Sequence, residues 1–139
     1  MQTEFDLQRF VSAQDAVYAS VLNELRHGRK RTHWMWFIFP QIAGLGHSAM
    51  AQQYAIGSGD EAAAYLAHPV LGPRLRECAA LVAAHAGTDI TTIFHAPDDL
   101  KFHSSMTLFA DVAPDEAVFQ TCLDTFFDGL SDPATLARL

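Results

Sequence analysis

The choice between an all-helical and a mixed fold rests on the run Trp34-Met35-Trp36-Phe37-Ile38-Phe39, which precedes Pro40. Six consecutive apolar residues suit either a short buried strand or a buried helical turn, and periodicity cannot separate the two. A lone strand would need a partner, and the chain has no second strand-like run. We therefore expect residues 34–39 to be helical or irregular, and a short strand remains the alternative. For the whole chain we expect an all-α fold.

Helical spacing continues on both sides of this run. Before it, apolar residues from Leu7 to Leu25 recur at helical spacing, with Asp6 as the expected N-cap and Gly28 just past the end. This segment is one long helix or two with a bend near Ser12. After the run, caps and prolines predict helical segments at residues 48–56, 58–67, 69–86, 88–94, 97–110, 114–128 and from 132 onward. The sum is a compact bundle of about seven helices.

Length and composition indicate one soluble domain over residues 1–139, without a linker. The chain is 50% hydrophobic and 18% charged, which is enough apolar side chain for a core. No run approaches the roughly 18 apolar residues of a membrane span, and residues 1–7 lack the features of a secretory signal. Cys78 and Cys122 fall on apolar faces of predicted helices, so we expect buried thiols and a reducing, cytoplasmic compartment.

The charge distribution is uneven. A net charge of −7 argues against general nucleic-acid binding, which needs a basic footprint. Four of the nine Lys and Arg residues nevertheless lie within six positions. We call this cluster the basic island; it comprises Arg26, Arg29, Lys30 and Arg31.

The basic island runs directly into the aromatic residues and permits two interpretations. In the first, the cations are a solvated helix end and the aromatics are core. In the second, a tryptophan stacks on a planar ligand whose anionic part the cations hold. If the protein is an enzyme, His33 is the candidate general acid–base, since its ordinary pKa lies near neutrality. The ligand-binding candidates in this segment are Arg29, Lys30, Arg31, Trp34, Trp36 and Gln41.

A second polar segment lies within the helix predicted from residue 97. Lys101 and Ser105 are four residues apart and share a face, next to Ser104 and Thr107. Serine and threonine are poor helix formers, so these hydroxyls either bond back to the preceding turn or line a polar pocket with Lys101. Lys101, Ser104 and Ser105 are the candidates for a second wall of the ligand site.

Two familiar motifs are incomplete in this chain. Residues 44–49 match the letters of the dinucleotide-binding fingerprint, but no strand precedes them and no parallel sheet follows. The glycines leave only a weaker prediction, that backbone amides before a helix could hold an anion. The seven histidines show no metal-ligand spacing, so the sequence predicts no metal site.

Three segments in order, Gly28–Gln41, Tyr65–Leu75 and Asp98–Phe109, resemble the domain-of-unknown-function family 1810. The resemblance spans Asp6 to Leu136 and implies a compact all-helical fold of this length, but no activity, cofactor or catalytic residue. Members are sometimes labelled calpastatin. Inhibitors of that kind are long, disordered and lysine-rich, whereas this chain is short, core-rich and acidic.

A shorter similarity, over residues 10–14 and 106–109, is to the family linked with ADP-ribose and NAD metabolism. It implies a ligand class only. The sequence therefore favours binding or processing of a polar, anionic, nucleotide-like or ADP-ribose-like small molecule. The alternative is a protein–protein interaction module that uses the basic–aromatic segment 26–39. A ligand pocket predicts that one tryptophan is accessible and the other is protected.

Overall fold

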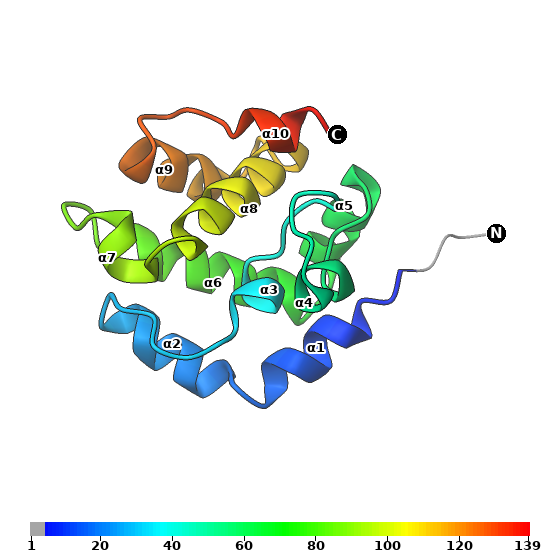
Figure 1. Cartoon of the computed structure of the whole chain (residues 1–139), viewed down its shortest axis with the longest axis horizontal. Coiled ribbons are helices and arrows are strands. Elements are labelled where there is room, and N and C mark those ends of the chain that lie inside the picture. Colours follow the sequence, from blue (N-terminus) through cyan, green and yellow to red (C-terminus); the bar gives the residue numbers. More distant parts are fainter. Residues whose placement is uncertain (1–4) are drawn as a thin grey trace.

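The computed structural model describes residues 5–139, and within them the protein is all-α, as the sequence predicts (Figure 1). One isolated bridge, between Ile42 and Ile56, is the single strand-like pairing in this part of the chain. The described residues form ten helices: α1 Gln8–Asp15, α2 Tyr18–Arg26, α3 Met35–Ile38, α4 Ala49–Gln53, α5 Gly59–Ala67, α6 Leu71–Ala83, α7 Ile90–Phe94, α8 Asp98–Val112, α9 Ala117–Phe126 and α10 Pro133–Leu136.

The helix count exceeds the expected seven because the first apolar segment is divided and short single-turn helices are present. The division lies at residues 16–17 and not near Ser12. Gln14, which interrupts the apolar face, is buried, and its amide donates to the Phe37 carbonyl (2.7 Å) and to the Tyr65 hydroxyl (3.0 Å). A polar residue at this position is therefore part of the core because its hydrogen bonds are satisfied there.

The predicted caps are met at α5 but not at α1. The Ser58 hydroxyl accepts from the Glu61 amide at 3.1 Å, and the Glu61 carboxylate accepts from the Gly57 amide at 2.7 Å, one residue before the position expected for a capping box. The expectation that Asp6 caps α1 is wrong. Leu7 occupies the N-cap and makes no side-chain cap bond.

The apolar run forms the short helix α3 and supplies the centre of the core. Trp34, Phe39 and Phe102 are each at most 1% exposed. The Phe39 and Phe102 rings meet edge to face with centroids 5.0 Å apart, and Phe94 packs on both. Five of the six residues in the run are buried and Trp36 is half-buried, so the run has no exposed polar face and shows no amphipathic period.

Helix α8 organises the C-terminal half of the molecule. It packs against α5, α7, α9 and α10, while α6 packs against α2, α5 and α9. Figure 1 shows the C-terminal α10, in red, beside α8. Lys101 and Ser104 of α8 lie near α10 and near the loop that follows α3.

None of the helices in the described part of the chain is long and apolar enough to cross a membrane. The prediction that the chain lacks a secretory signal concerns residues 1–7, of which residues 1–4 lie outside the described part.

Candidate functional site

One buried carboxylate fixes the turn that follows the basic island. Glu24 of α2 accepts from the Arg31 amide (2.6 Å), the Thr32 amide (3.0 Å), the Thr32 hydroxyl (2.6 Å) and the Trp34 indole (3.0 Å). Burial disfavours the charged carboxylate, but these hydrogen bonds outweigh it and lower the pKa of Glu24. The turn before α3 is therefore held by an ionised side chain.

This turn divides the basic island. Arg29 and Arg31 are exposed, whereas the Lys30 side chain is only 9% exposed and pairs with Asp98 at 3.0 Å. The Lys30 ammonium also lies 5.1 Å from the centroid of the Trp34 ring. The four cations of the cluster do not form one wall, because Lys30 points inward and the three arginines, Arg26 included, remain at the surface.

The two tryptophans occupy different environments. Trp34 is completely buried and its indole nitrogen donates to Glu24, so this ring is core. Trp36 is half-buried, and within residues 5–139 its indole nitrogen has no hydrogen-bond partner. Trp34 cannot stack on a ligand, while Trp36 presents both a ring and a free donor.

Asp98 connects the two segments that the sequence singled out. It pairs with Lys30 at 3.0 Å and with Lys101, one turn further along α8, at 3.4 Å. The Lys101 ammonium lies 5.4 Å from the centroid of the Trp36 ring. Two cations and one carboxylate leave this group with one net positive charge beside an accessible aromatic ring.

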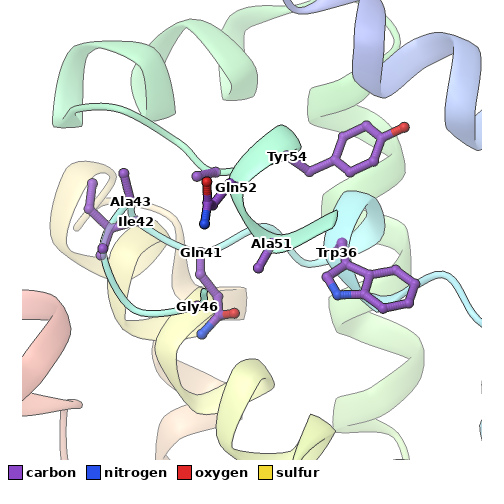
Figure 2. Close-up of a pocket in the computed structure, with 10 residues that line it drawn as sticks. Trp36, Gln41, Ile42, Ala43, Gly46, Ala51, Gln52 and Tyr54 are labelled. Atoms are coloured by element: carbon purple, nitrogen blue, oxygen red, sulfur yellow. The ribbon is translucent and has the colours of Figure 1, made fainter. Parts of the chain in front are cut away.

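Trp36 lines a pocket of about 140 Å³ under α4, shown in Figure 2. Trp36 extends from α3, Ala51 from α4, and Gln41 from the loop that follows α3 (Figure 2). The Gln41 side-chain amide has no partner among the described residues, so both its donors and its acceptor are available. The pocket thus offers an aromatic wall and a free amide. Its other walls include Ile42, Gly46, Gln52 and Tyr54.

A second pocket, of about 320 Å³, shares Gln41 and Gly46 with the first. It is lined also by Lys101 and Ser104 of α8, and by Asp132 just before α10. Gln41 borders both spaces, and Lys101 lies close to the Trp36 ring of the first. The two pockets form what we call the Gln41 site. Four of the predicted residues meet there: Trp36, Gln41, Lys101 and Ser104.

Two hydroxyls of α8 bond back to the preceding turn of the helix, the first of the two alternatives that the sequence left open. Ser104 bonds back to the Leu100 carbonyl at 3.2 Å, and Thr107 to the His103 carbonyl at 2.9 Å. The single Ser104 hydroxyl proton is shared between the Leu100 carbonyl and Asp132 Oδ2, the latter at 2.8 Å, which places the hydroxyl at the pocket edge. The Ser105 hydroxyl is fully buried without a partner among the described residues. Ser105 therefore lines neither pocket.

Three other candidates lie elsewhere. His33 and Arg29 are exposed and line neither pocket of the Gln41 site. Arg31 borders a separate surface pocket of about 260 Å³ beside His27 and Glu24. Because the structure does not bring His33 to the Gln41 site, its predicted acid–base role has no support from the geometry.

The remaining sequence signals are the glycine loop and the two cysteines. In the glycine loop, the Ser48 hydroxyl accepts from the Ala51 amide at 3.1 Å, and the helix that follows is only five residues long. Cys78 and Cys122 are free and buried, as expected, and burial raises the pKa of each thiol to about 12. Both thiols are inert at neutral pH.

Sequence reasoning missed Asp98 and Asp132 as site residues. In the sequence, both residues mark only the start of a predicted helix. The spacing of Asp98 before Lys101 was a usable signal for the local ion pair. Nothing in the sequence placed Asp132 beside Ser104, because that contact joins two elements far apart in the chain.

Comparisons with known proteins agree with the fold and leave the activity open. The family described as "Protein of unknown function (DUF1810)" matches residues 4–139. Among solved structures, the chain resembles the conserved hypothetical protein Rv1873 from Mycobacterium tuberculosis, with 54% identity and a TM-score of 0.95. That match covers 97% of this chain and 96% of the other. A comparison with curated proteins finds no match.

Proposed function

The chain belongs to the DUF1810 family, and we propose that it binds a small molecule that combines a planar ring with one anionic group, as nucleotides do. The observation that carries this proposal is the meeting of Trp36, Lys101 and Gln41. A half-buried ring, an ammonium 5.4 Å from its centroid and an amide without a partner among residues 5–139 border two pockets that share Gln41 and Gly46.

Each group has a distinct role in such a complex. The Trp36 face offers stacking area for a planar ring, and Gln41 can donate to and accept from the ring edge. Lys101 supplies the charge for the anionic substituent. Asp98 pairs with both lysines, and Lys101 is the cation that lines the wider pocket, so the site favours one anionic group over several.

The size of the site agrees with a small ligand. The wider pocket measures about 320 Å³, at the lower end of the range for small-molecule sites, roughly 300–1,000 Å³. A nucleoside monophosphate or a sugar phosphate suits this volume better than a larger dinucleotide such as ADP-ribose.

The alternative, a docking surface in segment 26–39, retains one supporting observation. Arg29 and Arg31 are exposed and form no ion pair within the described chain, so they could face an acidic partner. Buried Trp34 removes one of the aromatic anchors that such an interface needs. The ligand site is therefore the better supported function.

A thermal-shift screen tests the proposal with AMP, ribose 5-phosphate, ATP and ADP-ribose at millimolar concentration. Ligand binding to the folded state stabilises it by roughly 3 kcal/mol at a hundred times the dissociation constant. We expect AMP to raise the melting midpoint of the wild-type protein. Lys101→Met should abolish that rise, because it removes the ammonium and leaves the Lys30–Asp98 pair in place.

Arg29→Met is the matched control, since it removes a cation that is exposed and lies outside the site. It should keep the full AMP response. The proposal is wrong if none of the four anions shifts the midpoint, or if Lys101→Met responds like the wild type. Loss of the response only in Arg29→Met would assign anion binding to the basic island.

A further inference from the structure

A carboxylate borders the wider pocket of the Gln41 site and has no role in the function proposed above. Asp132 lines this pocket together with Lys101 and Ser104. It lies immediately before α10, the helix that packs beside α8 in Figure 1. An acid next to the cation of an anion site calls for a chemical reason, because it weakens the attraction for the anion.

Asp132 is held in place through one of its two oxygens. Its Oδ2 accepts from the Ser104 hydroxyl at 2.8 Å and from the Thr135 hydroxyl at 2.6 Å. Its backbone amide donates to the Thr107 hydroxyl at 2.9 Å. Within residues 5–139, Oδ1 receives no side-chain donor. A carboxylate can accept about four hydrogen bonds in all, so capacity remains at Oδ1.

The surroundings keep this carboxylate ionised. Burial disfavours the charge, but the hydrogen bonds from Thr135, Ser104 and the Ala134 amide, with the nearby His103, outweigh burial and lower the pKa of Asp132. At neutral pH the side chain is therefore an acceptor only. Its orientation is fixed before any ligand arrives, which lowers the entropic cost of binding.

We propose that Oδ1 of Asp132 accepts hydrogen bonds from hydroxyl groups of the ligand, so that the ligand carries a diol near its anionic group, as a ribonucleotide does. This inference rests on the proposed function and specifies its ligand class. A hydroxyl satisfies the acceptor while the anionic group reaches Lys101 in the same pocket. A ligand without hydroxyls would shield Oδ1 from water and offer it no donor.

Isothermal titration with AMP and with its 2′,3′-dideoxy analogue tests this inference. We expect the wild-type protein to bind AMP more tightly by on the order of tenfold, since a hydrogen bond to a charged group contributes at least that factor. Asp132→Asn should bind both compounds equally. Its amide oxygen has to accept from Ser104 and Thr135, so its amino group faces the ligand and cannot accept a hydroxyl.

Asp111→Asn is the matched control, because it makes the same change at an exposed carboxylate that lines neither pocket of the Gln41 site. It should keep the full preference for AMP. Equal wild-type affinity for the two compounds, or an undiminished preference in Asp132→Asn, overturns the inference and leaves the proposed function intact. Absence of AMP binding to the wild-type protein overturns both.

Discussion

Single side chains determine which residues of segment 28–41 are buried and which line a pocket. Glu24 binds the turn at Arg31 and Thr32 and also the Trp34 indole, and this contact carries Trp34 into the core. Trp36, two residues later, stays at the border of a pocket. Removing the Glu24 charge should therefore affect the whole segment and not only one hydrogen bond.

We expect Glu24→Gln to lower the free energy of unfolding at pH 7 by about 2–3 kcal/mol, because charge-assisted hydrogen bonds are replaced by neutral ones. The pKa of Glu24 is lower in the folded state than in the unfolded state. Its contribution is therefore complete above the unfolded value of about 4.3 and is lost as the pH falls through the folded value.

Urea denaturation at pH 7 and at steps from pH 5 to pH 2.5 measures this effect. The difference between the wild type and Glu24→Gln should be constant down to about pH 5 and should shrink at lower pH. A difference that does not change over this range would show that the carboxylate charge has no part in holding the turn.

The candidate residues could be predicted from the sequence only in part. Trp36, Gln41 and Lys101 are candidates from the sequence, and the structure brings them to the border of the two pockets. Arg29 and His33 are also candidates from the sequence but are exposed elsewhere. Residue type alone cannot tell which side of a turn a side chain will face.

At the scale of helices, the sequence predicts a helix end correctly where residues close in sequence satisfy the terminal hydrogen bonds. The Ser58 cap, the proline-led start of α8 and the end of α2 at Gly28, whose φ is +69°, follow from neighbouring residues. The break at residues 16–17 does not, because the bonds of Gln14 reach Phe37 and Tyr65 in distant elements. Long-range contacts override local periodicity there.

The cap of α5 gives a direct test at this scale. We expect Ser58→Ala to lower the free energy of unfolding by about 1 kcal/mol, the usual effect of losing a serine N-cap. Ser131→Ala is the matched control, since Ser131 is exposed and makes no side-chain hydrogen bond in the described chain. Urea denaturation should place the control within about 0.5 kcal/mol of the wild type. Equal effects of the two substitutions would contradict a role for the cap.

At the scale of the whole molecule, the Gln41 site lies where the loop after α3, helix α4, helix α8 and the start of α10 meet. The all-α fold followed from periodicity and from the missing strand partner. The site did not, because Gln41, Lys101 and Asp132 come from separate parts of the chain and meet only through tertiary packing. The overall charge of −7 also conceals the cation that Lys101 contributes to the wider pocket.

The chain contains two tryptophans, so their indole N–H resonances form a two-signal probe of the site. We expect titration of the ¹⁵N-labelled protein with AMP to move the Trp36 signal, since this ring lines the pocket near Lys101. The Trp34 signal should stay in place, because its N–H is buried against Glu24. The Trp36→Phe variant assigns the two signals. Saturating AMP that moves neither signal, or only that of Trp34, would contradict a ligand site at Trp36, Gln41 and Lys101.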